Sequence, residues 1–270
     1  MDLARYLRPD WHPNSSPLAF AHWALRVPFL SASGAARIAD HASGRVPARW
    51  RSDFARHRVL VMGSGPSLDR VDDRFVSDYD SVVHINFALR RARGRASDYF
   101  FTTDAGPIRQ YGAAHGFADF AALGPERAIF APVFQDQWHA FTPAGRALFT
   151  WLAPDRTGWR LQRARGLPLV WRRHPVQPRW DSFRLPAPGR TLPVLDHSSA
   201  LTAVMFAAIH GARTVDLIGC DFAAGRALSA ESPQAVPDAQ LFSGAASALR
   251  AMIPALARHG VPVRNRSWEV

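Results

Sequence analysis

The stretch Arg58-Val-Leu-Val-Met-Gly-Ser-Gly-Pro-Ser-Leu-Asp69 decides how the rest of the chain is interpreted. Residues 59–62 form a short apolar run with two β-branched side chains, which predicts one buried strand. The run ends in Gly63 and Gly65, which allow a sharp turn close to a ligand. Pro66 follows, and its fixed φ suits the first turn of a helix. A strand, a glycine turn and a helix start in this order favour a phosphate or ribose site.

The turn departs from two well-known phosphate-binding motifs. Leu68 stands where the third glycine of the Gly-x-Gly-x-x-Gly fingerprint belongs. The chain has no lysine, so it cannot form the lysine-containing P-loop either. A tight turn that holds no ligand therefore remains the alternative interpretation of this stretch.

Composition indicates one ordinary globular domain with an appendage. The chain has 270 residues, of which 47% are hydrophobic, and this is enough for a single core. Its one cysteine, Cys220, excludes an intramolecular disulfide framework and a multi-cysteine zinc site. No apolar run reaches the roughly 18 residues of a membrane-spanning helix, and the N-terminus has no apolar signal region. We expect a cytoplasmic protein.

The charge is strongly positive, at +11, and all 33 basic residues are arginine. Such a field attracts anionic partners, including nucleotides, acidic glycans and phospholipid surfaces. The sequence contains no RNP, helix-turn-helix or zinc-finger pattern that would direct the charge at a nucleic acid. We therefore expect no nucleic-acid partner.

Residues 1–56 are expected to form an N-terminal helical appendage. Residues 18–30 are apolar and aromatic, with basic residues nearby and with Pro28 interrupting the run. This mixture suits a helix that lies at a membrane interface, which would place the protein peripherally at the inner face of the cell membrane. A helical arm that packs on its own domain, or on a second subunit of a homo-oligomer, fits the pattern equally well.

Strands and helices alternate over residues 57–270. The expected strands are residues 59–62, 80–86, 97–104, 127–133, 214–221 and 261–265, and the expected helices are residues 201–210 and 243–259, the second bent at Pro254. This alternation predicts an α/β fold with a doubly wound, mostly parallel, Rossmann-like sheet in a single nucleotide-binding domain. Residues 135–193 lack a sustained period, and we expect a lid-like insertion with short helices there.

Polar residues follow several of these strands. Ligands of doubly wound sheets bind beyond the carboxyl ends of the strands, so these side chains should share one site. Ser198 or Ser199 should cap the helix that begins near residue 200, and its N-terminus would offer a second anion site at the same edge. The strand-end residues are Gly63 to Ser67, Asn86, Thr103, Asp104 and Asp221.

Several blocks of the chain resemble the bacterial sialyltransferases of glycosyltransferase family 42. A more distant similarity extends to animal sialyltransferases and to bacterial flagellin-glycosylation proteins. The resemblance runs from about residue 58 to 267. The blocks that carry it are Val59-Leu-Val-Met-Gly-Ser-Gly-Pro-Ser-Leu68, Asp80-Ser-Val-Val-His-Ile-Asn86, residues 198–222, and Gly260-Val-Pro-Val-Arg-Asn-Arg-Ser267.

The resemblance implies an enzyme that transfers an acidic sugar, sialic acid or Kdo, from a CMP-activated donor with inversion and without an obligatory metal or other cofactor. The acceptor would be a surface glycan or a lipooligosaccharide or capsule precursor. By position, the ribose and phosphate would be held by Gly63, Ser64, Gly65 and Ser67. Asn86 would contact the nucleotide, and Thr103 or Asp104 would take the place of a polar residue that contacts the donor. Ser198 and Ser199 would bind the donor's phosphate or carboxylate, and Asp221 with Phe222 the cytidine.

Two family residues are not matched. The catalytic histidine would fall near Gln240 to Phe242 and the phosphate-side tyrosine at Ala223, and neither residue type is present there. The acceptor hydroxyl must lose a proton, so another base is needed. The candidates are Asp104 first, followed by His197, Asp196 and His174. Arginine could replace the tyrosine beside the leaving phosphate, and the insertion contains Arg160, Arg163, Arg165, Arg172 and Arg173.

Other functions remain open. Asp78-Tyr-Asp80 has the letters of a metal-binding Asp-x-Asp, but it precedes its strand and should lie at the opposite edge of the sheet, so we expect no metal site. A pterin-diphosphokinase-like enzyme also begins with a strand followed by Gly-x-Gly-Pro-Ser, and it would need Mg²⁺ and ATP. A CMP-binding protein without transferase activity is the alternative outside enzymes.

Overall fold

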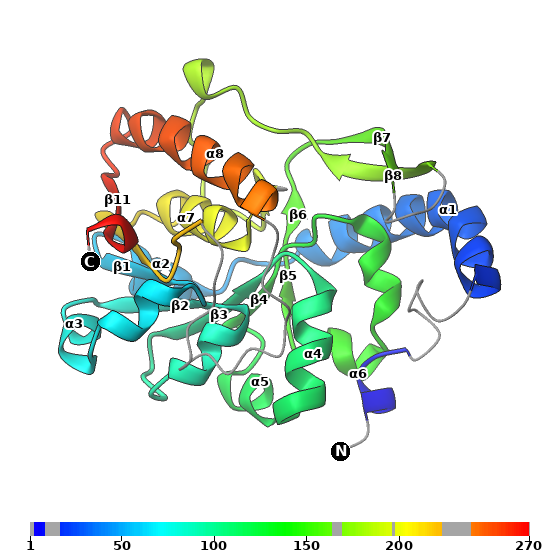
Figure 1. Cartoon of the computed structure of the whole chain (residues 1–270), viewed down its shortest axis with the longest axis horizontal. Coiled ribbons are helices and arrows are strands. Elements are labelled where there is room, and N and C mark those ends of the chain that lie inside the picture. The colour runs from blue at the N-terminus through cyan, green and yellow to red at the C-terminus, as the bar shows by residue number, and fades with distance from the viewer. Residues whose placement is uncertain (1–2, 9–16, 164–168, 196–197, 223–238, 270) are drawn as a thin grey trace.

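Seven parallel strands form the central sheet, in the order β11-β10-β1-β2-β3-β4-β5 (Figure 1). The computed structural model describes residues 3–8, 17–163, 169–195, 198–222 and 239–269. The strands are β1 Arg58–Met62, β2 Ser81–Ile85, β3 Asp98–Thr102, β4 Ala128–Phe130, β5 Thr150–Trp151, β10 Thr214–Ile218 and β11 Val263–Asn265. The predicted α/β, doubly wound, parallel fold is confirmed.

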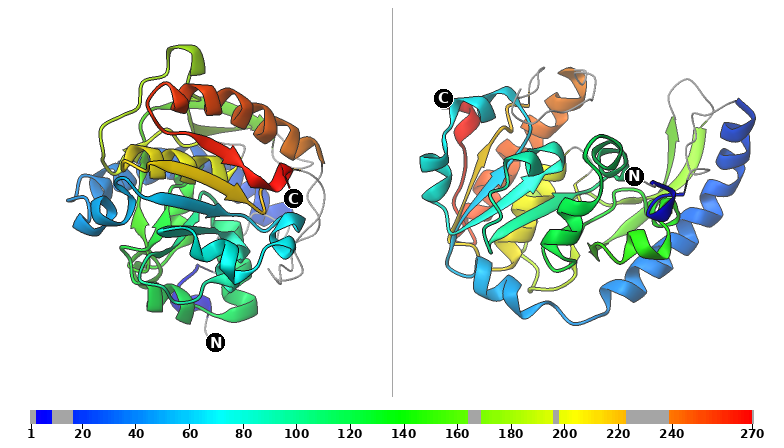
Figure 2. Two further views of the ribbon diagram at one scale, coloured as in Figure 1. Left: turned by 90° about the vertical axis from the view of Figure 1, so that its left-hand side faces the viewer. Right: turned by 90° about the horizontal axis from the view of Figure 1, so that it is seen from below.

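Helices cover both faces of the sheet (Figure 2). One face carries α2 Ala48–Phe54, α7 Ser199–Ile209 and α8 Ala239–Ala257. The other carries η3 Pro66–Arg70, α3 Asp73–Ser77, η4 Asn86–Arg91, α4 Ala105–His115 and α5 Ala118–Leu123. The expected helix after the first glycine turn is thus a short 3-10 helix, η3.

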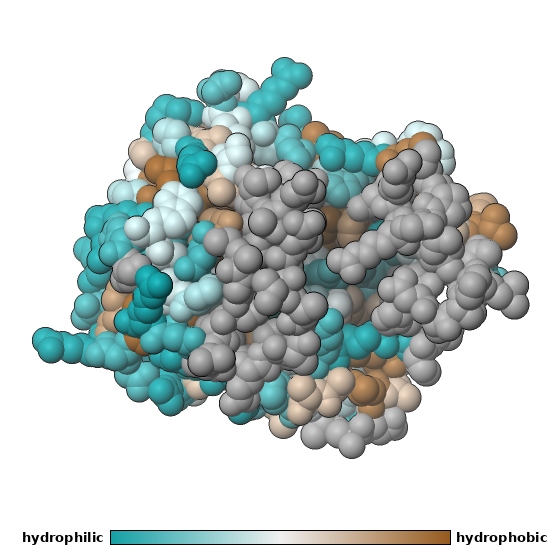
Figure 3. Space-filling view, in the orientation of Figure 1, coloured by the Kyte–Doolittle hydropathy of each residue, from teal (hydrophilic) through white to brown (hydrophobic). Residues whose placement is uncertain are grey.

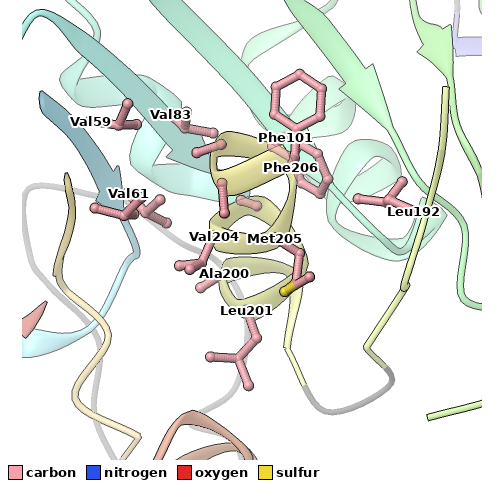
Figure 4. Close-up of a cluster of buried hydrophobic side chains, with 14 of the residues drawn as sticks. Val59, Val61, Val83, Phe101, Leu192, Ala200, Leu201, Val204, Met205 and Phe206 are labelled. Atoms are coloured by element: carbon pink, nitrogen blue, oxygen red, sulfur yellow. The ribbon is translucent and has the colours of Figure 1, made fainter. Parts of the chain in front are cut away.

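Successive side chains of each strand point to opposite faces of the sheet, and each face has its own hydrophobic core. Val59 and Val61 face the layer of α7, and Leu60 and Met62 face the opposite layer. Residues 200–209 of α7 are all buried, because the helix lies between the sheet and α8 (Figure 4). A helix that is apolar all round is the kind that a core encloses completely.

The N-terminal segment is one long helix, α1 Pro17–Ala42, and Pro28 does not end it as the sequence led us to expect. Proline removes one helical hydrogen bond, but Val27 and Ser31 are fully buried against the rest of the protein, and this packing holds the helix together. A Cβ on Gly34 would collide with the carbonyl of Gln135, so α1 lies directly on that backbone. No helix within the described ranges is both long enough and apolar enough for a membrane crossing.

The insertion contains more strand than the expected helical lid. Its short helices are η5 Gln135–Ala140, α6 Pro143–Arg146 and η6 Trp180–Ser182. Its strands are β5 of the main sheet, the pair β6 Ala153–Pro154 and β9 Thr191–Leu192, and the antiparallel hairpin of β7 Thr157–Arg163 and β8 Leu169–Pro175. The hairpin escaped prediction because its apolar side chains Trp159, Leu161 and Trp171 are exposed, while the half-buried Arg172 points inward to Asp136, which reverses the usual pattern of burial.

An ion pair fixes the hairpin to the rest of the molecule. Arg172 of β8 donates from Nε and Nη2 to the two carboxylate oxygens of Asp136, over 3.0 and 2.7 Å. Its guanidinium carbon also lies 3.8 Å from the ring centroid of Phe134. The Asp136 carboxylate is completely buried. Arg172 is therefore the bidentate counter-ion of a buried carboxylate.

Replacing Arg172 should destabilise the fold strongly. In Arg172→Met the buried Asp136 carboxylate loses its counter-ion, and we expect a loss of about 3–5 kcal/mol in the free energy of unfolding, measured in urea. Arg93→Met is the matched control, because Arg93 pairs with Asp73 at 2.9 Å on the surface. The control should lose less than about 1 kcal/mol. Equal losses in the two variants would contradict a special role for the buried pair.

A buried histidine should make the fold sensitive to acid. His210 packs against the rings of Trp50 and Phe206, at centroid distances of 5.1 and 4.6 Å, and burial lowers its pKa to about 4. The unfolded chain takes up this proton near pH 6.5 and the folded chain does not, so stability falls as the pH falls between these values. We expect a loss of about 2 kcal/mol from this group between pH 7 and pH 5.

The comparison of urea unfolding at the two pH values tests this expectation. His210→Leu should lose less stability on acidification than the unchanged protein does. The same loss in both proteins would show that other groups control the acid response.

Candidate functional site

The turns that follow β1 and β10 fit into each other. The N–H of Gly63 donates to the carbonyl of Ile218, and the N–H of Gly65 donates to the carbonyl of Gly219, each over 2.7 Å. A Cβ on Gly63 would collide with the carbonyl of Gly219, and a Cβ on Gly219 would collide with the carbonyl of Gly63. Gly219 also has a φ of +65°. The glycines are therefore required by contact between two backbones.

A carboxylate of the protein occupies the start of η3. Asp221 accepts from the backbone N–H of Ser67 at 3.2 Å and from its hydroxyl at 2.9 Å. The Ser67 hydroxyl is fully buried and accepts in turn from the N–H of Gly219, at 3.0 Å. The N–H groups of Gly63, Gly65 and Ser67, on which the predicted phosphate site depends, thus have partners within the protein. Ser64 beside them is half-buried.

A second cluster lies at the carboxyl ends of β2 and β3. Asn86 follows β2 with a φ of +53°, a left-handed conformation that asparagine tolerates better than most residues. Its side-chain oxygen accepts from the hydroxyl of Thr102, at 2.7 Å.

Phe222, in the turn after β10, also has a positive φ of +51°, which is rare for a bulky residue and typical of functional sites.

The start of α7 is attached to the end of β3. The hydroxyls of Thr103 and Ser199 lie 2.8 Å apart, and the Thr103 N–H donates to the Ser199 oxygen at 3.1 Å. Ser198 is the N-cap and accepts from the N–H of Ala200, at 3.2 Å. The predicted capping role is confirmed. The positive end of the helix dipole is therefore held at the carboxyl edge, beside a half-buried pair of serines.

Asp104 presents an exposed carboxylate beside this helix start. It is the N-cap of α4, and its Oδ1 accepts from the N–H of Gly106 at 3.0 Å and from Nε2 of Gln137 at 2.7 Å. Within the described part of the chain, its Oδ2 has no hydrogen-bond donor. Gln137 was not found from the sequence, because nothing in its neighbourhood there marks a residue of the insertion as a partner of β3.

The other predicted base and phosphate candidates are placed as follows. His174 is buried in the hairpin, with its ring against Phe134, and Arg172 is committed to Asp136. Asp196, His197, Arg165 and Ala223 lie outside the described residues. The structure therefore gathers Asn86, Thr103, Asp104, Ser198 and Ser199 at one edge, and it ties Gly63, Gly65, Ser67 and Asp221 together beside them.

The opposite edge of the sheet has different features. Asp80 accepts from the N–H of Arg58 at the start of β1, so the Asp-x-Asp lies at the amino edge as predicted. A groove of about 560 Å³ lies near the starts of β4 and β5, between His41, Glu126 and Arg190, away from the candidate site. In the described ranges no three histidine, cysteine or acidic side chains group as metal ligands do.

Comparisons with protein-family models, with curated proteins and with solved structures found no match. The functional proposal therefore depends on the fold and on the geometry of this edge.

Ser67 and Ser64 should differ sharply in their effect on stability. Ser67→Ala removes a buried hydroxyl that serves Asp221 and Gly219, and we expect a loss of about 1–3 kcal/mol in the free energy of unfolding. Ser64→Ala removes a half-buried hydroxyl in the same turn and should change stability by less than about 0.5 kcal/mol. Urea unfolding of the two variants measures both. A loss in Ser64→Ala as large as in Ser67→Ala would show that the buried network is not what holds the turn.

Proposed function

We propose that the chain is a metal-independent, inverting glycosyltransferase that moves an acidic sugar, sialic acid or Kdo, from a CMP-activated donor to an acceptor hydroxyl. The observation that carries the proposal is the position of Asp104. This exposed carboxylate lies at the carboxyl edge of a doubly wound sheet, beside the N-terminus of α7 and one strand from Asn86. Such edges are where this class of fold binds nucleotides.

The donor is assigned to the cluster around α7. The helix N-terminus with Ser198 and Ser199 suits the phosphate or carboxylate of the donor. Asn86 and Thr103 offer polar groups to the nucleotide or sugar. Because Asp221 is held by Ser67, we assign the cytidine contact to the partly exposed Phe222 and the rim of its turn. We assign the phosphate to the N-terminus of α7 for the same reason, since the N–H groups of Gly63, Gly65 and Ser67 already have partners within the protein.

The proposed reaction needs a proton acceptor for the acceptor hydroxyl and stabilisation of the leaving CMP. The acceptor oxygen forms a bond to the anomeric carbon on the face opposite to CMP, and the bond to the phosphate oxygen breaks with its electrons leaving on CMP. The acceptor proton goes to Oδ2 of Asp104, while Gly106 and Gln137 hold Oδ1 in place. The dipole of α7 favours the developing negative charge on CMP. His197 is the next candidate for the base.

A second candidate function is nucleotide binding without transfer. It is favoured by the missing family histidine and tyrosine and by the closed hydrogen bonding of the glycine turn. In either case we propose a cytoplasmic protein, whose acceptor in the first case is a surface glycan or a lipooligosaccharide or capsule precursor. Assembly into a homo-oligomer stays a prediction.

Ligand binding is measured first, as a thermal shift with CMP, UDP, ATP with Mg²⁺, and NAD. A ligand at about a hundred times its dissociation constant adds roughly 2.7 kcal/mol of stability. We expect a shift with CMP that EDTA does not change. A shift with ATP and Mg²⁺ alone would instead indicate a kinase of the pterin-diphosphokinase type and would refute the proposal.

Asp104→Asn should separate binding from catalysis. Asparagine caps a helix as well as aspartate does, so the fold and the CMP shift should persist, while transfer from the CMP-sugar falls by a factor of about 10²–10⁴. Asp72→Asn is the matched control, because Asp72 caps α3 at 2.9 Å from the N–H of Phe75. Full activity in Asp104→Asn would exclude it as the base. CMP binding with no turnover in the unchanged protein would favour the second candidate function.

A further inference from the structure

One face of the β7–β8 hairpin is apolar and exposed. In the antiparallel register Trp159 lies opposite Arg173, and Leu161 lies opposite Trp171, so these four residues share a face. The exposed fractions of Trp159, Leu161 and Trp171 are 47%, 44% and 52%. We call these four residues the hairpin face.

On the opposite side of the hairpin, the residues of β8 are packed. Val170 and His174 are buried, and Arg172 is paired with Asp136. The N–H of Arg173 donates to the buried hydroxyl of Ser31 in α1, at 2.9 Å. The hairpin is thus attached firmly on one side, and its attachment presents the hairpin face outward in a fixed orientation.

Positive charge accompanies the apolar surface. Residues 157–175 include five arginines and no acidic residue, and of the five Arg172 is neutralised by Asp136 on the packed side. The Arg173 guanidinium lies 5.9 Å from the ring centroid of Trp159. The adjoining helix α1 adds Leu25 and Phe29, each 78% exposed, with Arg26 between them.

The hairpin and the N-terminal half of α1 lie side by side at one end of the molecule (Figures 1 and 2). Hydrophobic atoms reach the surface among hydrophilic ones at this end (Figure 3). The two elements thus combine exposed apolar side chains with arginines in one region of the surface.

We propose that the hairpin face, with the neighbouring end of α1, binds the surface of an anionic lipid bilayer. Tryptophan prefers the boundary between headgroups and acyl chains, and arginine beside it meets the lipid phosphates. A second copy of the chain would bring the same positive charge and be repelled. A nucleic acid would satisfy the arginines but offer no apolar partner to Leu161, Leu25 and Phe29. A bilayer satisfies both kinds of side chain.

The test is vesicle flotation of the full chain, and it needs no enzymatic activity. The probes are vesicles of phosphatidylcholine, with and without phosphatidylglycerol. The unchanged protein should float with the mixed vesicles and remain behind with pure phosphatidylcholine, and added salt should weaken the binding. The variant is Trp159→Ser combined with Trp171→Ser, which should lower vesicle binding by roughly tenfold or more.

Trp268→Ser is the matched control. Trp268 is 46% exposed, with the Arg250 guanidinium 5.5 Å from its ring centroid. It ends the short helix η8 Arg266–Trp268 next to the C-terminus, and Figure 1 shows the C-terminus at the opposite end of the molecule from the hairpin. This variant should float like the unchanged protein. The proposal is overturned if the unchanged protein ignores anionic vesicles, or if the double variant binds them undiminished. It is also overturned if light scattering shows a dimer that the double variant alone dissociates.

Discussion

The contact between the turns after β1 and β10 is the constraint on which the edge of the sheet depends. The chain runs from β1 outward to β5 and then returns to place β10 on the other side of β1. At this reversal the two turns approach so closely that neither Gly63 nor Gly219 has room for a side chain. The approach also brings Asp221 to the start of η3, where it satisfies Ser67. The polar groups left for a ligand at this edge are therefore those at the ends of β2 and β3 and at the start of α7.

The same contact shows which features could be predicted from the sequence and which could not. The six strands expected from the sequence all lie in the central sheet, because β-branched and aromatic runs between glycine and polar residues leave few alternatives, but the strands of the insertion, β5 to β9, were missed. The glycine turn was also located correctly, but its purpose was not visible. A glycine indicates that something lies close to the backbone, and it does not say whether a ligand or another segment lies there. Here the partner is Gly219, more than 150 residues away, and only the strand order brings it near.

Several features that the sequence could not predict depend on contacts between residues that are distant along the chain. Arg172 looked like a candidate for binding phosphate until Asp136 was found against it. Pro28 looked like a break in α1, because the packing that holds Val27 in place is tertiary. Gln137 gave no signal at all, since its meaning comes from Asp104. In each case the role of the residue is set by a tertiary contact that its neighbours in the sequence do not reveal.

The short helix η5 contacts both regions for which we propose a function, namely the edge that carries Asp104 and the β7–β8 hairpin. Its carbonyl at Gln135 lies under Gly34 of α1, Asp136 holds the hairpin through Arg172, and Gln137 holds Asp104. Consecutive side chains of a 3-10 helix point about 120° apart, so the neighbours Asp136 and Gln137 can reach two different elements, while the backbone of Gln135 contacts a third. The proposed base and the proposed membrane-binding hairpin are therefore fixed to adjacent residues of one rigid turn. If both proposals hold, binding of the hairpin to a bilayer sets the position of Asp104 relative to that surface. A lipid-linked acceptor would then meet the base from a defined direction.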